Sequence, residues 1–293
     1  MLRRVLLVLV LAAGLVHVPS LPAAAQPGTH ERAVTMYGVW DRSYLLHVPP
    51  GPEPRARRPL VVALHGGLND MHYMRESTGL DAVADRNGFL VAYPDGFMRT
   101  WNAGGCCWFA RMAGIDDVAF LDALIDGLVR EGLADPARIY LTGFSNGGGM
   151  AYRYACERAR RVAAVGVVSG SLAVDCAPRD PVSVMAFHGT ADFSVPFGGG
   201  GDQDWNNPVP FPPVRAVIDF WREVARLAPL RRITLETAKT VCRTTGPGRG
   251  GAEVEFCTIF DGGHEWPRGQ GVDPEIEASP LLWRFFSAHA RRG

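Results

Sequence analysis

The sequence has almost no lysine, since Lys239 is the only residue among its 30 basic side chains that is not an arginine. The 30 acidic residues balance the basic ones, so the formal net charge at pH 7 is zero. A chain without excess positive charge has no long-range attraction for nucleic-acid phosphates or for an anionic membrane surface. We therefore expect neither nucleic acid nor a membrane as a partner of the mature chain.

Several other signals are also missing. There is no Cys-x-x-Cys pair and no His/Cys cluster with zinc spacing, and the acidic segment 202–206 lacks the glycine and closing glutamate of a calcium loop. We therefore expect no metal and no cofactor. No internal repeat or Ser/Thr/Pro-rich linker divides the chain, and 47% of its residues are hydrophobic. One large α/β domain over residues 26–293 is the simplest organisation.

Residues 1–25 have the pattern of a secretory signal peptide. Arg3 and Arg4 precede an apolar stretch over 5–18, and small residues end at Ala25, after which we expect cleavage. The alternative is an uncleaved anchor, which the short apolar stretch disfavours. We therefore expect a secreted, extracellular protein.

The six cysteines are then expected to form disulfides, as is usual outside the reducing cytosol. Two strand-like runs, 233–241 and 253–260, place Cys242 and Cys257 across a hairpin, which makes them the favoured pair. A second plausible bridge joins Cys156 and Cys176. The adjacent cysteines at 106 and 107 are left open: they pair with each other or with different partners.

Short apolar runs alternate with helical segments along the chain, which favours a mostly parallel sheet covered by helices on both faces. The expected strands are 37–48 (one or two), 60–64, 89–93, 138–141, 163–168, 182–187, 233–241 and 253–260. The expected helices are 73–87, one beginning at 116–117, 148–157, 213–227 and 280–290.

Residues 143–147 read Gly-Phe-Ser-Asn-Gly, a G-x-S-x-G pattern between a predicted strand and a predicted helix. A serine in such a turn is held in a strained conformation with its hydroxyl exposed, and the glycines avoid steric overlap with the neighbouring strand and helix. The alternative is a plain glycine-rich turn. The surrounding elements favour Ser145 as the nucleophile of a hydrolase.

A serine hydroxyl needs a histidine to take its proton and an acid to orient that histidine. In hydrolases built on such a sheet the order along the chain is serine, acid, histidine. His264 and Asp192 follow predicted strands and satisfy this order, so they are the expected base and acid. The alternatives are a loop histidine without a role and an acid chosen among Asp175, Asp180, Asp202 and Asp204. His188 and His65 are expected to serve packing and hydrogen bonding.

Backbone amides must stabilise the oxyanion of the tetrahedral intermediate. One donor is expected from Asn146, the residue after the nucleophile, and the other from Gly67 or Leu68 in the loop after the strand 60–64.

The chain resembles the secreted polyhydroxybutyrate depolymerase and feruloyl esterase group, close to carbohydrate esterase family one. The matching stretches are LHGG (64–67), YPDG (93–96), WNAG (101–104), DDVAFL (116–121), GFSNGG (143–148), HGTAD (188–192) and GGHEWP (262–267). The resemblance implies an α/β-hydrolase fold, carboxylic ester hydrolysis, and catalytic roles for Ser145, Asp192 and His264. It also suggests that Trp101 and Trp266 line the substrate cleft; the alternative is that they pack in the core.

The resemblance leaves the substrate open among hydroxybutyrate oligomers, feruloyl esters and acetyl esters. Depolymerases of solid polymer usually carry a linker and a separate binding domain, so their absence here favours soluble esters or short oligomers. The segment 198–213, rich in glycine and proline, is a candidate cleft wall or flap. Rival functions are a peptidase or another hydrolase on the same fold, and a non-catalytic polymer- or carbohydrate-binding protein.

Overall fold

The computed structural model describes residues 26–51, 57–201, 207–248 and 250–291. The predicted signal peptide and the acidic segment 202–206 lie outside these residues. Within them, no helix is both long enough and apolar enough to cross a bilayer.

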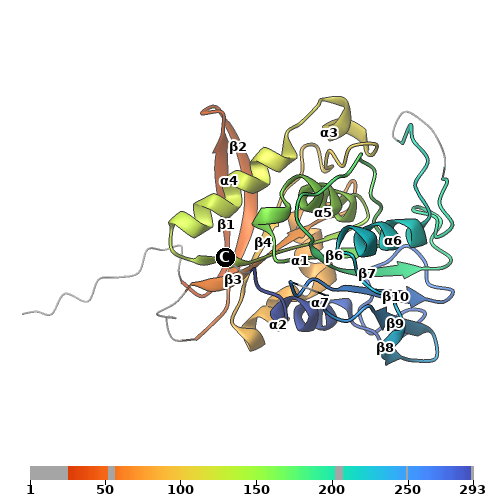
Figure 1. The fold of residues 1–293 in the computed structure, drawn as a ribbon. Coiled ribbons are helices and arrows are strands. Elements are labelled where there is room, and N and C mark those ends of the chain that lie inside the picture. Colours follow the sequence, from red (N-terminus) through yellow and green to blue (C-terminus); the bar gives the residue numbers. More distant parts are fainter. Residues whose placement is uncertain (1–25, 52–56, 202–206, 249, 292–293) are drawn as a thin grey trace, which may run out of the picture.

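One ten-stranded sheet forms the centre of the molecule, in the order β1-β2-β4-β3-β5-β6-β7-β10-β9-β8 (Figure 1). The strands are β1 (Gly28–Met36), β2 (Trp40–Val48), β3 (Arg58–Leu64), β4 (Leu90–Pro94), β5 (Ala134–Phe144), β6 (Ala164–Val168), β7 (Ser183–Gly189), β8 (Arg232–Glu236), β9 (Thr240–Thr244) and β10 (Val254–Ile259). The strands from β4 to β10 in this order pair in parallel, and two antiparallel strands flank them at each edge. The prediction of a mostly parallel sheet is confirmed.

Helices cover both faces of the sheet, as expected (Figure 1). They are α1 (Met71–Thr78), α2 (Leu80–Asn87), α3 (Trp108–Met112), α4 (Asp117–Arg130), α5 (Asn146–Glu157), α6 (Val214–Val224) and α7 (Ala278–Ser287), with a 3₁₀ turn at Ala159–Arg161. One core contains α4, α5 and α6, and the other contains α1, α2 and α7. Helix α3 is a short turn in the loop after β4.

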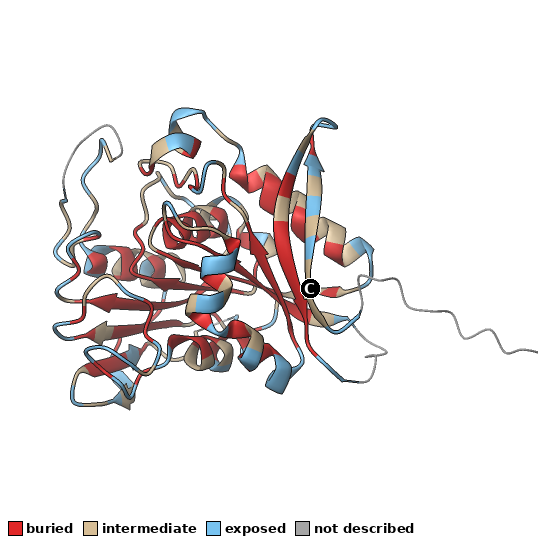
Figure 2. Cartoon of the chain, turned by 180° about the vertical axis from the view of Figure 1, so that it is seen from behind, coloured by how far each residue is buried: buried red, intermediate tan, exposed pale blue. Residues whose placement is uncertain are grey.

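Strand β3 explains how a wholly apolar run fits this arrangement. Leu60, Val62 and Leu64 belong to the core under α4 to α6, whereas Val61 and Ala63 belong to the opposite core. Alternate side chains of a strand point to opposite faces, so a strand covered on both sides needs apolar residues throughout. Figure 2 shows that the central strands are almost entirely buried.

Three of the differences from the predictions concern whole elements. The helix expected over 73–87 is two helices, because Gly79 adopts a left-handed conformation (φ 60°) that ends α1 and begins α2. The strand expected over 233–241 is β8 and the start of β9, paired antiparallel. Strand β1 was not predicted, because an edge strand with one exposed side carries few apolar residues.

The described cysteines form three disulfides. The two pairs predicted from the sequence, Cys242–Cys257 and Cys156–Cys176, are confirmed, with Cα atoms 3.9 and 5.6 Å apart. Cys106 and Cys107 pair with each other. The Cys242–Cys257 bridge joins β9 to β10, where the two cysteines lie directly opposite each other in the antiparallel pair.

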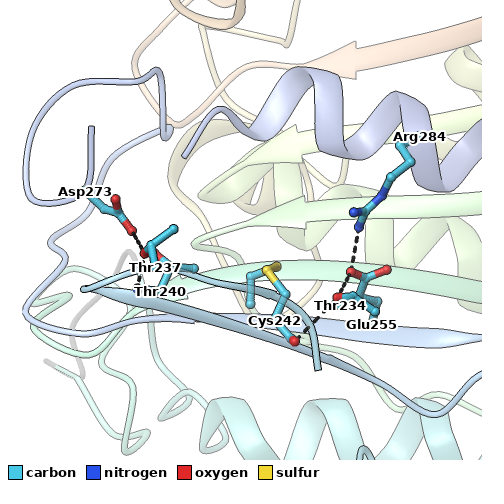
Figure 3. Close-up of a disulfide and its surroundings, with 8 residues drawn as sticks. Thr234, Thr237, Thr240, Cys242, Glu255, Asp273 and Arg284 are labelled. Carbon is cyan, nitrogen blue, oxygen red and sulfur yellow. Dashed lines mark hydrogen bonds and ion pairs between the residues drawn. A yellow bond between two sulfur atoms is a disulfide. The ribbon is translucent and has the colours of Figure 1, made fainter. Parts of the chain in front are cut away.

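A buried carboxylate lies beside the Cys242 bridge (Figure 3). Glu255 on β10 accepts hydrogen bonds from Thr234 on β8 at 2.5 Å and from Arg284 on α7 at 2.7 Å. This cluster ties the edge strands to α7 and is separate from the loops described next.

Candidate active site

The predicted catalytic residues follow different strands of the parallel block. Ser145 follows β5, Asp192 follows β7 and His264 follows β10, each by a few residues. Because parallel strands end at the same edge of a sheet, these loops gather on one side of the molecule, where sites of such folds form.

Ser145 lies at a sharp turn between β5 and α5. Its backbone has φ 53° and ψ −118°, a strained conformation for a residue with a side chain. A Cβ at Gly143 would overlap the backbone of Gly147, and one at Gly147 would overlap the carbonyl groups of Leu64 and His65. The two glycines of the motif are therefore required by close backbone packing, as the sequence indicated.

Asp192 and His264 form a hydrogen-bonded pair. Oδ2 of Asp192 lies 2.8 Å from Nδ1 of His264, and its Oδ1 accepts the amides of Ser194 and Val195, each at 2.9 Å. Burial alone would raise the pKa of Asp192, but hydrogen bonds from His188, His264 and the Val195 amide hold that pKa well below its usual range. Asp192 is therefore a buried carboxylate at neutral pH.

The ring of His264 packs against Phe144, the residue before Ser145, with centroids 4.8 Å apart. Since Asp192 occupies Nδ1, Nε2 is the nitrogen left to act on a substrate or on the serine. No hydrogen bond between the Ser145 hydroxyl and His264 is formed among the described residues. Such contacts often tighten only when substrate is bound.

His188 supports the acid loop. Its Nε2 donates to the carbonyl of Val195 at 2.8 Å and lies 3.4 Å from Oδ2 of Asp192. His65 is fully buried, and its Nε2 accepts the amide of Gly96 at 2.9 Å. Both histidines have the packing and hydrogen-bonding surroundings expected from the sequence.

Two of the backbone amides predicted as oxyanion donors have no hydrogen-bond acceptor of their own among the described residues. Asn146 is the first residue of α5, so its N–H has no partner within the helix, and the N–H of Gly67 has no hydrogen-bond acceptor among the described residues. The prediction for Leu68 has to be corrected, because its N–H donates to the carbonyl of Arg99 at 2.7 Å. Gly67 is therefore the remaining candidate in that loop.

The two tryptophans predicted to line the cleft lie in the core instead. Trp101 has no exposed surface and Trp266 is 7% exposed, and neither lines the cavity beside Ser145. Their indole N–H groups donate to the carbonyl of His65 and to the Ser279 hydroxyl, respectively. Buried hydrogen bonding between distant segments, which the sequence does not reveal, accounts for their positions.

A cavity of about 350 Å³ opens beside Ser145 and Asn146. Its apolar walls come from separate loops: Cys106, Cys107, Trp108, Phe193, Val195 and Phe211. Sequence reasoning did not assign these residues to the site, although Phe211 lies in the segment proposed as a cleft wall. The only signal for the others was their position next to the catalytic motifs.

A family profile and similar sequences indicate the same family of esterases. Residues 42–194 match the profile of the family described as Esterase PHB depolymerase. Feruloyl esterase C of Emericella nidulans is 34% identical over 211 residues, which cover 68% of this chain and 73% of that protein. The protein NocK of Nocardia uniformis subsp. tsuyamanensis is 30% identical over 276 residues, covering 84% and 76%.

Solved structures agree on the fold. The acetyl xylan esterase from Aspergillus awamori superposes with a TM-score of 0.63 at 14% identity, covering 88% of this chain and 99% of that one. A ferulic acid esterase gives a TM-score of 0.56, also at 14% identity, with 89% and 97% covered. With the fold, the family match and these relatives together, the chain belongs to the PHB depolymerase esterase family and is a carboxylic ester hydrolase of the α/β-hydrolase fold.

Proposed function

We propose that the protein is a secreted serine esterase that cleaves its ester through an acyl-enzyme on Ser145. The observation that carries this proposal is the 2.8 Å hydrogen bond between buried, ionised Asp192 and His264, whose ring packs against Phe144, the residue before the strained Ser145. A carboxylate on Nδ1 holds the imidazole in the tautomer whose Nε2 is free to accept a proton.

In the first half of the reaction, Oγ of Ser145 attacks the ester carbonyl carbon while Nε2 of His264 takes its proton. The carbonyl oxygen becomes an oxyanion, which the amides of Asn146 and Gly67 stabilise. When the tetrahedral intermediate collapses, the ester C–O bond breaks and the leaving alcohol takes the proton from His264.

In the second half, water takes the place of the alcohol. His264 removes a proton from it, the hydroxide adds to the acyl carbon, and the second tetrahedral intermediate expels Oγ. The serine recovers its proton from His264, so the enzyme returns to its starting state and no external reactant except water is consumed.

The substrate class we propose is hydroxybutyrate oligomers or the feruloyl or acetyl esters of plant polysaccharide. The names of the family and of the relatives support these acyl groups. The apolar cavity beside Ser145 supports an acyl or alcohol group that buries carbon surface. A panel of methyl ferulate, acetylated xylan and hydroxybutyrate oligomers decides among them.

Secretion is supported by the three disulfides of the described structure, which are typical of oxidising compartments. N-terminal sequencing of the protein recovered from the culture medium tests the expected cleavage after Ala25. Recovery of an uncleaved, cell-associated chain would contradict secretion.

The serine mechanism is tested by comparing Ser145→Ala with Ser169→Ala. Ser169 follows the neighbouring strand β6 and also has a positive φ of 50°, yet it does not line the cavity. We expect Ser145→Ala to lose about 10⁶-fold in kcat on a p-nitrophenyl ester and Ser169→Ala to retain activity. Comparable hydrolysis by Ser145→Ala would rule out the acyl-enzyme, and faster cleavage of peptide anilides than of esters would favour a peptidase.

A further inference from the structure

Three of the hydrogen bonds that Trp101 makes reach the segments that carry the proposed oxyanion donors, and a fourth is local, from the amide of Ala103 to the Trp101 carbonyl. Its backbone N–H donates to Oδ1 of Asn146 at 2.7 Å, and its carbonyl accepts from Nδ2 of the same side chain at 3.0 Å. Its indole Nε1 donates to the carbonyl of His65 at 3.0 Å. Trp101 itself is fully buried and does not reach the cavity.

Asn146 and His65 belong to the two segments that carry the proposed oxyanion donors, which we call the two arms of the site. Asn146 begins α5 directly after Ser145, and His65 immediately precedes Gly66 and Gly67 at the end of β3. The indole also packs on the imidazole of His65, with ring centroids 5.0 Å apart. Residue 101 thus contacts both arms, the Asn146 arm through its backbone and the His65 arm through its indole.

The loop that carries Trp101 is hydrogen-bonded to a buried ion pair between Arg42 and Asp117. The amide of Asn102 donates to Oδ2 of Asp117 at 2.7 Å, and the other carboxylate oxygen accepts from Arg42 at 2.7 Å. The Arg42 guanidinium lies 5.8 Å from the Trp101 ring centroid. Arg42 and Asp117 are both buried, so the hydrogen bonds and the ion pair that hold this loop are shielded from solvent.

We propose that Trp101 is a positioning residue that sets the distance between the two oxyanion donors, acting through Asn146 and His65. Donors must lie about 2.7–3.1 Å from the place where the oxyanion forms, so small shifts of either arm weaken transition-state binding more than substrate binding. This inference rests on the proposed function, since it assigns a role within that same site.

The test is Trp101→Phe, which removes the indole N–H but keeps an aromatic ring in the core. The matched control is Trp221→Phe, because Trp221 is also fully buried and its Nε1 has no hydrogen-bond partner among the described residues. We expect Trp101→Phe to lower kcat on a p-nitrophenyl ester by about 10- to 100-fold with KM within about twofold, a part of the loss seen when a whole donor is removed. Trp221→Phe should keep the wild-type kcat.

A second readout isolates the oxyanion. An alkyl trifluoromethyl ketone adds to the serine as a tetrahedral adduct, so its affinity should fall in parallel with kcat in Trp101→Phe and stay unchanged in Trp221→Phe. A purely structural role for Trp101 predicts a loss of thermal stability in Trp101→Phe without a selective loss of kcat or of ketone affinity. Equal kcat values for the two variants, or a rise in KM with unchanged kcat, would overturn the proposal.

Asn146→Ala covers the case in which Trp101→Phe does not fold. This variant keeps the backbone N–H of residue 146 but loses both side-chain bonds to Trp101, so kcat and ketone affinity should fall together with KM nearly unchanged. Wild-type activity in Asn146→Ala would also refute the role. If the wild-type enzyme neither reacts with a fluorophosphonate nor cleaves esters, the proposed function fails; if it does both while the variants match their control, only the positioning role fails.

Discussion

Nδ1 of His264 lies 2.8 Å from Oδ2 of Asp192, although 72 residues separate them in the chain. Both carboxylate oxygens are engaged, and the side chain of Asp192 is fully buried. A carboxylate so placed fixes both the orientation and the tautomer of the imidazole.

Replacing this acid should mainly affect turnover. Asp192→Asn should lower kcat by about 10⁴-fold, because an amide in place of the carboxylate favours the wrong imidazole tautomer. The matched control is Asp175→Asn, which makes the same change at an exposed position. Steady-state kinetics on a p-nitrophenyl ester measure both, and an Asp192→Asn enzyme within tenfold of wild type would contradict the role of the acid.

The same carboxylate should make stability depend on pH. Because the pKa of Asp192 is held well below its unfolded value of about 3.9, its contribution is complete above that pH and is lost as the pH falls toward the folded pKa. The difference in the free energy of unfolding between wild type and Asp192→Asn should therefore shrink below about pH 4. Urea denaturation between pH 3 and 7 tests this, and a constant difference over the range would argue against it.

The buried pair of Arg42 and Asp117 predicts a second pH dependence, of opposite sign. Burial raises the pKa of Asp117, even though Arg42 and the Asn102 amide act to lower it. Arg42→Met leaves this carboxyl without its counter-charge, so we expect a loss of about 3–5 kcal/mol in the free energy of unfolding.

That loss should grow as the pH rises, because a carboxyl with a raised folded pKa favours folding in its neutral form, and ionising it costs stability. Arg160→Met, which breaks an exposed pair with Asp180, is the control and should change little. A penalty for Arg42→Met that falls with rising pH would contradict this account.

The disulfides should have separable effects. Replacing Cys242 and Cys257 with alanine should lower the free energy of unfolding by about 3 kcal/mol, the value for a loop of their 15-residue separation, while kcat at 25 °C is retained. Chemical denaturation and ester assays check the two halves of this prediction. Loss of activity in a fully folded variant would show that the edge hairpin matters for the site.

Cys106 and Cys107 lie in the cavity wall, so their replacement should change substrate preference. We expect the double alanine variant to raise KM for methyl ferulate by about tenfold relative to p-nitrophenyl acetate, because a small acyl group needs less of the wall. The double alanine variant of Cys156 and Cys176, which are outside the cavity, should leave this ratio unchanged. If the ratio of the two KM values were unchanged in both variants, the Cys106–Cys107 part of the cavity wall would not contribute to substrate selectivity.

Much of this architecture could be predicted from local sequence. The run Leu60–Leu64 is apolar at every position because both its faces are covered, so its burial in a parallel sheet was readable. Ser145, Asp192 and His264 were predicted from chemistry and chain order, since each follows a strand and only one order suits this fold.

The remaining features depend on contacts between distant segments. The amide of Leu68 is engaged by Arg99, and Trp101 is hydrogen-bonded to two loops, and neither fact leaves a trace in the neighbouring residues. The sequence around Gly79 fits one continuous helix as well as two consecutive helices. Only the left-handed backbone of Gly79, visible in the structure, shows that α1 ends there. The residues that line the cavity come from several loops, so they could not be predicted from neighbouring residues either.

The most direct test of the account is to trap the acyl group. The wild-type enzyme is mixed with a p-nitrophenyl ester, whose good leaving group speeds acylation relative to deacylation, then quenched in acid during the first turnover, digested and analysed by mass spectrometry. We predict one acyl group on the peptide that contains Ser145 and none in Ser145→Ala. An acyl group on another residue, or a first turnover of the wild-type enzyme that releases the acid without any covalent adduct, would contradict the mechanism.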